Sequence, residues 1–202
     1  RNVTADEAVA TAKQFGEHLA TLGVPVYYYE DAATRPARKS LPKIRKGQYE
    51  ALAEKMLDPD FTPDAGPAEF NAKSGATITG SRFPLLAYNV NLATTDLDLA
   101  TRIAKSIRES GGGFPAVRAI GLALEAKQQV QVSMNLVDYR ITAISTVFEA
   151  IRAQAAEAGV AIADAELVGP VPLAAFEDAL KHYLQLDTFD MRQIVENAIL
   201  DQ

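Results

Sequence analysis

The chain has 202 residues, of which 48% are hydrophobic and 23% charged, and its formal net charge at pH 7 is -6. This length allows one large globular domain or two small ones, and the acidic balance argues against a nucleic-acid partner held through its phosphates. No apolar run approaches the roughly 20 residues of a membrane span, and the first residues do not resemble a signal peptide. We therefore expect a cytoplasmic protein without a membrane partner.

Cysteine is absent, and histidine occurs only at His18 and His182. Without cysteine there is neither a disulfide framework nor a thiolate for catalysis or metal binding. The two histidines are far apart in the sequence, which argues against a histidine-rich metal centre. We expect no metal, and we interpret both histidines as structural residues of helices.

The first part of the chain predicts one helix, a strand and a long connection. Thr4 and Glu7 form a capping-box pattern at the start of the helix, and Gly23 ends it. "VPVYYYE", residues 24–30, is typical of a buried strand, and a basic connection with a short helix near residues 48–56 follows. The apolar residues at helical spacing in the first helix are Val9, Ala12, Phe15, Leu19 and Leu22.

The stretch "PDAGPAEFNAKSGATITGSR", residues 63–82, becomes strand-like only at residues 76–79. Glycine permits a close approach of the backbone to a bound molecule, and proline stiffens the path around it. A ligand-binding loop and a plain linker both explain this composition, and linkers are the commoner structure. The residues concerned are Pro63, Gly66, Pro67 and Gly75.

The pattern becomes regular from residue 84, where two helical periods alternate with four strand-like runs. We expect helices at 96–110 and 142–158, with Leu97, Ala100, Ile103 and Ile107 of the first one facing inward. A tight "EAKQ" turn joins the second and third strands into a hairpin, and a helical region follows Pro172. The four strands are expected at 84–92, 116–124, 128–136 and 160–168.

The order βαββαβ predicts an α+β fold with a ferredoxin-like subdomain at residues 83–202 and both helices on one face of its sheet. Residues 1–82 hold too few strands to close a sheet of their own. We interpret them as the second half of an N-terminal α/β subdomain whose beginning is missing.

Polar side chains alternate with apolar ones in the first and third of these strands. Because alternation sends the two sets to opposite faces, and these strands are neighbours in a ferredoxin-like sheet, we expect one polar cluster on the face without helices. Amide and hydroxyl groups both donate and accept, so this cluster is either a solvated face or the wall of a cleft that binds the carboxylates and polar ring edges of a small ligand. It comprises Asn89, Asn91, Gln131, Ser133 and Asn135.

Several segments in order, from about Thr4 to Pro172, resemble glutamate formiminotransferase. They are "PVYYYEDAATRPARKSLPKIRKGQYEAL", "PDAGPAEFNAKSGATITGSR", "AYNVNL", "QVSMNLVD" and "ELVGPVP". The resemblance implies a one-carbon transferase of histidine degradation that moves a formimino group from N-formimino-L-glutamate to tetrahydrofolate, its co-substrate. It also implies two α/β subdomains whose sheets face each other across a folate tunnel.

The resemblance places folate binding on the loop from Gly66 to Gly75. Physically, Arg82 and the polar cluster are candidates for binding the substrate, because the planar fork of arginine suits a carboxylate. The loop residues are Gly66, Pro67, Ala68, Glu69, Phe70, Asn71, Ala72, Lys73, Ser74 and Gly75.

Two departures from the family pattern concern catalysis. The family's histidine segment, similar to "HxGEHPRMGA", is absent, and neither His18 nor His182 matches its context, so no catalytic residue is assigned. Asp164 and Ala165 stand where the family has Gly-Ser before "ELVG". We expect a family member without its first third, which binds ligands but is inactive as an isolated chain.

Two further interpretations and one structural question remain open at this point. A non-catalytic folate- or amino-acid-binding module and a ferredoxin-like oligomerisation domain are the alternatives to a transferase, and a homodimer and a monomer are both compatible with the sequence.

The basic connection is either a solvated face or an electrostatic guide for anionic substrates. Its charges are Arg35, Arg38, Lys39, Lys43, Arg45 and Lys46.

Overall fold

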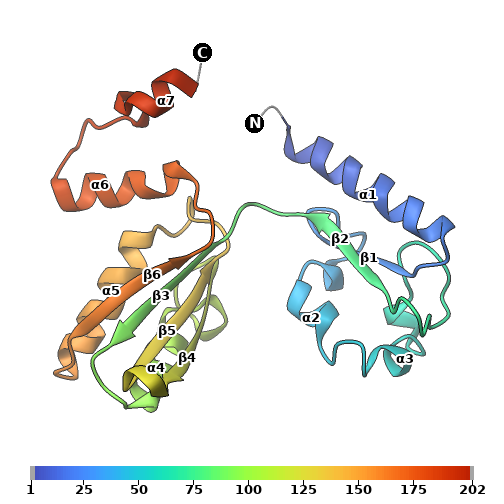
Figure 1. Cartoon of the computed structure of the whole chain (residues 1–202), viewed down its shortest axis with the longest axis horizontal. Helices are drawn as coiled ribbons and strands as arrows, with labels where there is room; N and C mark the ends of the chain where they lie inside the picture. The colour runs from blue at the N-terminus through green and yellow to red at the C-terminus, as the bar shows by residue number, and fades with distance from the viewer. Residues whose placement is uncertain (1–2, 201–202) are drawn as a thin grey trace. The chain divides into compact units, whose positions relative to one another are not determined.

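The computed structural model describes residues 3–200, and the chain divides after Arg82 into two compact units (Figure 1). Unit 1 ends at Arg82 and unit 2 begins at Phe83. Each unit combines helices with a sheet and has hydrophobic clusters of its own, so the architecture is mixed α and β throughout. Among the described helices, none is long and apolar enough to cross a bilayer.

Unit 1 is built on a parallel pair of strands, β1 (Val26–Glu30) and β2 (Thr77–Ser81). Helix α1 (Ala5–Thr21) lies on one side of the pair, and the short helices α2 (Leu41–Arg45) and α3 (Leu52–Lys55) lie on the other (Figure 1). The capping box at Thr4 is confirmed, with both of its reciprocal hydrogen bonds to Glu7 present. The expected short helix near residues 48–56 is reduced to α3.

Helix α1 packs on β1 through its smallest residues. Ala12 and Gly16 are buried, and a Cβ at Gly16 would lie 2.6 Å from the ring of Tyr28. Val9 and Leu19 pack against the same cluster, as expected. Phe15 and Leu22, also expected in the apolar stripe, are 51% and 65% exposed, and Leu22 lies beyond the last residue of the helix.

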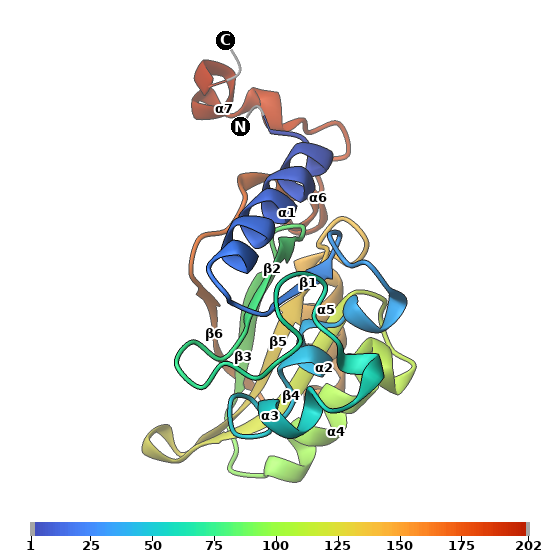
Figure 2. The ribbon, with the colours of Figure 1, turned by 90° about the vertical axis from the view of Figure 1, so that its right-hand side faces the viewer.

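Unit 2 contains an antiparallel sheet with the strand order β4-β5-β3-β6, which Figure 2 shows. Helices α4 (Leu97–Ile107) and α5 (Ile144–Glu157) touch each other and share one core cluster with the sheet, so both cover the same face, as the sequence predicts. The strands are β3 (Leu86–Leu92), β4 (Val117–Leu124), β5 (Gln129–Leu136) and β6 (Ile162–Val168).

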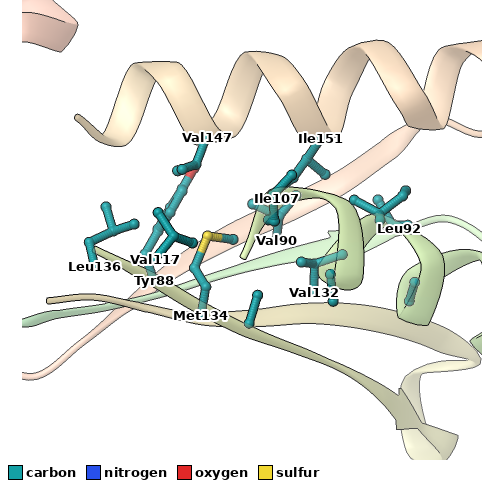
Figure 3. Close-up of a cluster of buried hydrophobic side chains, with 14 of the residues drawn as sticks. Tyr88, Val90, Leu92, Ile107, Val117, Val132, Met134, Leu136, Val147 and Ile151 are labelled. Carbon is teal, nitrogen blue, oxygen red and sulfur yellow. The ribbon is translucent and has the colours of Figure 1, made fainter. Parts of the chain in front are cut away.

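The core of unit 2 lies between this sheet and its two helices. Figure 3 shows Val147 and Ile151 of α5 pointing towards the sheet, Val147 on the side of Tyr88 and Ile151 on the side of Val90. Ala100, Ile103 and Ile107 of α4 are buried as expected. Leu97, the first residue of α4, is 41% exposed, contrary to expectation, and the buried stripe of the helix begins at Leu99.

The chain continues after Pro172 into the expected helical region. Helix α6 (Glu177–Leu184) is followed by α7 (Val195–Leu200). Ala175, in the turn before α6, belongs to the core cluster of unit 2 and ties this region to the sheet domain.

Candidate functional site

Unit 1 contains a cavity of about 310 Å³ on the face of β1 and β2 that carries α2 and α3. Its walls are mostly aromatic and aliphatic, and a few polar side chains stand among them. The position follows from strand alternation, because Tyr27 points to this face while Val26 and Tyr28 point to α1. The lining residues are Tyr27, Ile44, Arg45, Gln48, Tyr49, Leu52, Phe61, Ser74, Gly75, Ala76 and Ile78.

Arg38 holds two of the aromatic walls in place. Its guanidinium carbon lies 4.6 Å from the ring centroid of Tyr27 and 4.7 Å from that of Phe61. Nη2 donates to the carbonyl oxygens of Asp60 (3.3 Å) and Thr62 (2.9 Å), whereas Nε is buried without a partner. Arg38 is only 2% exposed, so this member of the basic connection is neither solvated nor an exposed guide for substrates.

Lysine and arginine together make the surroundings of Phe61 electropositive. Lys55 Nζ lies 4.0 Å from the centroid of this ring and donates to the carbonyl oxygens of Ile44 and Lys46. Burial lowers the pKa of Lys55, and the charges of Arg38 and Lys46 lower it further. Burial is also the main cause of the lowered pKa of Arg38.

Asp64 is the nearby buried countercharge. Its side chain is 1% exposed and accepts from the backbone N–H of Tyr28 (2.9 Å) and from the hydroxyl of Thr34. Arg35 Nε lies 4.0 Å from the same carboxylate. The negative charge of Asp64 opposes the effect of burial on the pKa of Arg38.

Three polar side chains on the cavity lining have no partner. Arg45, Gln48 and Ser74 are exposed, and within residues 3–200 their side chains make no hydrogen bond or ion pair. Gln48 has a φ of 50°, directly after Gly47 with a φ of 79°. A non-glycine residue in this left-handed region is strained, and here the strain lies at the edge of a cavity.

The loop predicted to bind folate, residues 66–75, reaches the cavity at its end only, through Ser74 and Gly75. Gly66 has a φ of 83°, and a Cβ there would lie 2.4 Å from the carbonyl oxygen of Val24. The close approach that requires glycine at this position is therefore to the chain itself.

Phe70 and Asn71 brace this loop. The ring of Phe70 packs against Tyr49, with 5.5 Å between centroids, and the Tyr49 hydroxyl donates to the carbonyl of Ala72 at 2.9 Å. Asn71 Nδ2 donates to the carbonyl of Gly23 at 3.0 Å, while Oδ1 accepts from two backbone amides further along the loop. Ligand contacts of the exposed loop residues stay a prediction for Pro67, Ala68, Glu69, Ala72 and Lys73.

Unit 2 presents its polar residues on the sheet face opposite α4 and α5. The five predicted members of the cluster lie on this face, in neighbouring positions of β3 and β5. Asn91, Gln131 and Asn89 are 0%, 5% and 8% exposed, whereas Ser133 is half-buried and Asn135 exposed. Three rows cross the face from β4 to β6: Leu122, Gln131, Asn91 and Asp164; Ile120, Ser133, Asn89 and Glu166; Arg118, Asn135, Ala87 and Val168.

The amides of this face donate towards two carboxylates that sequence reasoning missed as site residues. Gln131 Nε2 donates to Asn91 Oδ1 at 2.8 Å, and Asn91 Nδ2 donates to Asp164 Oδ1. Glu166 Oε1 accepts from Asn89 Nδ2 at 3.0 Å and from Gln131 Nε2 at 3.2 Å. The sequence signal that could have identified these two carboxylates is their alternation with apolar residues along the last strand.

This arrangement changes what the face can bind. Gln131 Nε2 donates twice within the network and Asn91 has no exposed surface, so Asp164 and Glu166 are the exposed members of the network. Asn135 and Arg118 are exposed on the same face. Carboxylates are acceptors only. Asp164 and Glu166 add acceptors for ligands with N–H donors, and binding of a carboxylate by the amides of this face stays a prediction.

Arg82, the remaining predicted site residue, and the two histidines lie outside both features. Arg82 is exposed and, in the part of the chain that the structure describes, has no hydrogen-bond or ion-pair partner. His18 lies exposed on α1, and His182 on α6 packs edge-on against Tyr183, with 4.8 Å between ring centroids. Neither histidine lines the cavity.

Comparison with known proteins accounts for both units. Residues 1–82 match the family described as "Formiminotransferase domain, N-terminal subdomain", and residues 87–200 match "Formiminotransferase domain".

The relatives include two glutamate formimidoyltransferases. The one from Streptococcus pyogenes serotype M1 is 43% identical over 202 residues, covering 99% of this chain and 68% of the relative. The one from Thermoplasma acidophilum is 42% identical over 197 residues, covering 96% and 65%. The formimidoyltransferase-cyclodeaminase of Rattus norvegicus is 46% identical over 190 residues, and this chain spans 35% of its length. The chain therefore belongs to the formiminotransferase domain family.

Proposed function

We propose that the chain acts in the folate-dependent transfer of a formimino group from N-formimino-L-glutamate to tetrahydrofolate. The observation that carries this proposal is the match of both family descriptions, the first of which ends at residue 82, where the two units divide. Tetrahydrofolate would be the co-substrate, and the mechanism would need no metal.

The architecture that we propose for this function has two parts. Residues 83–202 form a ferredoxin-like subdomain, a proposal supported by the strand order β4-β5-β3-β6 and by helices on a single face. Residues 1–82 form the second half of an N-terminal α/β subdomain. Their two-stranded parallel sheet supports this, because parallel sheets usually have more strands.

In this proposal the two units recognise different chemical groups. Loop 66–75 and the adjoining cavity of unit 1 contact folate, with Ser74 and Gly75 at the cavity itself. The polar face of unit 2 contacts nitrogen-bearing groups. The formimino group is an amidine and carries N–H donors, which can donate to the free carboxylate oxygens of Asp164 and Glu166. The carboxylates of the substrate have no such donors and suit these two side chains less well.

The chain's own residues would bind and orient the reactants but would not supply a histidine base. Neither histidine lies in the cavity or on the polar face. A positioned base typically accelerates proton transfer steps by about 10²–10⁴-fold. We therefore expect the purified 202-residue chain to transfer formimino groups slowly. Turnover at the rate of the Streptococcus relative, measured in the same assay, would overturn this part of the proposal.

Folate binding can be tested with calorimetry, using 5-formyltetrahydrofolate as a stable probe. Phe70→Ala removes the support of Tyr49, and Gly75→Val places a branched side chain 3.1 Å or less from that ring. We expect each change to weaken binding by about 1–3 kcal/mol, the scale of a lost buried contact. Phe15→Ala, on the exposed side of α1, is the matched control. If both loop variants bind 5-formyltetrahydrofolate as tightly as the parent chain, residues 66–75 are a linker and do not bind folate.

A further inference from the structure

The connection between the two units is held at both of its ends. On the side of unit 1, Ser81 is the last residue of β2, and its carbonyl oxygen accepts from the backbone N–H of Asp31 at 3.0 Å. On the side of unit 2, β3 begins at Leu86, which has no exposed surface. Along the chain, only residues 82–85 therefore lie between the two sheets.

Phe83, inside this connection, is held by two side chains of unit 2. Its ring centroid lies 5.2 Å from that of Tyr139, and the guanidinium carbon of Arg140 lies 3.7 Å from the ring centroid of Phe83. Aromatic pairs at this separation and cations over a ring are both stabilising. Tyr139 and Arg140 belong to the loop between β5 and α5, so these contacts fasten the connection to unit 2 before its first strand begins. We call Phe83, Tyr139 and Arg140 the linker clamp.

Arg140 is itself fixed in place by Asp138. Nε and Nη2 of Arg140 donate to Oδ1 (2.9 Å) and Oδ2 (2.6 Å) of the Asp138 carboxylate, and Oδ1 also accepts from the backbone N–H of Arg140 at 3.0 Å. This bidentate pair orients the planar guanidinium, and the hydrogen bond from the Arg140 side chain holds the pKa of Asp138 below its ordinary value. The cation is therefore already positioned over Phe83, and little side-chain freedom is lost when the contact forms.

Pro84 stiffens the remaining path, and only Arg82 is left without support. The proline ring fixes its own φ and confines the residue before it, Phe83, to extended conformations. Arg82 is exposed, and within residues 3–200 its side chain has no hydrogen-bond or ion-pair partner. It therefore stands between a residue held by the sheet of unit 1 and a residue held by the linker clamp.

We propose that the linker clamp reduces the connection between the two units to a single-residue pivot at Arg82. One residue supplies only two soft backbone torsions, so the clamp limits the freedom of the connection to the rotations about Arg82. Loss of the clamp releases residues 82–85 together and turns the pivot into a flexible tether. This conformational device goes beyond the proposed function and depends on no ligand.

Tryptic cleavage after Arg82 tests the pivot, because proteolysis follows the population of chains in which the segment around the bond has opened. The fragment 83–202 is quantified by mass spectrometry in digests of the full 202-residue chain. Each rate is divided by the rate for the same chain unfolded in urea, which removes the effect of sequence on the protease. We expect Arg140→Met to speed cleavage about two- to fivefold, the effect of losing one exposed cation–π contact. Phe83→Ala removes the ring pair as well, and we expect cleavage about 10-fold faster or more.

Arg152→Met is the matched control. The side chain of Arg152 is 61% exposed, as is that of Arg140, and it also donates to a carboxylate through Nε and Nη2, but it lies on α5 and its partner is Glu149. We expect this variant to be cleaved after Arg82 at the rate of the parent chain. Equal rates for Arg140→Met and Arg152→Met overturn the inference.

A double variant shows whether Arg140 acts through Phe83. Residues that act through one contact are not additive, so Arg140→Met should have no further effect in a chain that already carries Phe83→Ala. If Arg140→Met speeds cleavage as much in that chain as in the parent, Arg140 restrains the connection by another route, and the linker clamp is refuted.

Discussion

Replacing Arg38 by methionine tests how the aromatic wall of the cavity is held. Methionine keeps an apolar stem but removes the guanidinium that lies against the rings of Tyr27 and Phe61. The change therefore removes the charge, the hydrogen bonds and the ring contacts of Arg38 together.

The magnitude follows from the contacts that are lost. Hydrogen bonds from the charged group to the carbonyls of Asp60 and Thr62 contribute about 1.5 kcal/mol each, at the low end because these residues are exposed and their carbonyls can be rehydrated. Two cation–π contacts contribute about 0.5 kcal/mol or more each. The buried, unpaired Nε opposes these terms by about 1–3 kcal/mol. The net destabilisation expected for Arg38→Met is about 2 kcal/mol.

Hydrogen exchange of the β1 backbone amides is the appropriate assay, because two units with separate cores need not unfold together. A loss of about 2 kcal/mol corresponds to exchange about 30-fold faster in unit 1. Arg35→Met is the control, since the Arg35 side chain is 41% exposed and comes no closer than 4.0 Å to the carboxylate of Asp64. We expect this change to lower the free energy of unfolding by less than about 0.5 kcal/mol. Exchange in the Arg38→Met variant as slow as in the parent chain would refute the reasoning, and would show that the buried charge is no better than an apolar side chain.

Two further predictions concern tyrosines. Gly16→Ala should lower the thermal midpoint of unfolding, because the new Cβ would lie 2.6 Å from the ring of Tyr28 and such overpacking costs about 1–3 kcal/mol. A higher midpoint would contradict this and would mean that the greater helix propensity of alanine, worth about 1 kcal/mol, outweighs the overpacking. Burial raises the pKa of Tyr27 and of Tyr88 from 10.0 to about 12. Since the folded state holds these protons more tightly than the unfolded one, stability should be intact below pH 10 and should fall as the pH rises towards 12. Circular dichroism and tyrosinate absorbance followed together over this range check it, and a constant unfolding midpoint across it would contradict it.

Patterns that depend on near neighbours were readable from the sequence. The capping box of Thr4 and Glu7 involves residues three apart. The separation of Asn89 and Asn91 from Val90 needs only the alternation of a strand, and it correctly placed the polar cluster on one face. The division of the chain at Arg82 also agrees with a change of pattern in the sequence.

Features that depend on distant pairing were not readable. Arg38 is surrounded by basic residues in the sequence, and only the fold brings Tyr27 and Phe61 to its two sides. Asp164 and Glu166 join the amides through the register of β6 on β3, which shifts near Asn91 and cannot be read from alternation. Local periodicity assigns a face to each side chain, but the neighbours across a sheet are set by register.

The row Gln131, Asn91, Asp164 has a direction, since each amide donates to the next side chain towards β6. Asp164 sets that direction, because a carboxylate at the end of the row can only accept. A residue without an acceptor at position 164 would leave Asn91 Nδ2 without its partner, whereas Gln131 Nε2 would still donate to Glu166 Oε1. A single residue on the edge strand thus fixes the orientation of a fully buried amide two strands from the opposite edge, and exchanging it would leave that amide with an unsatisfied donor inside the protein.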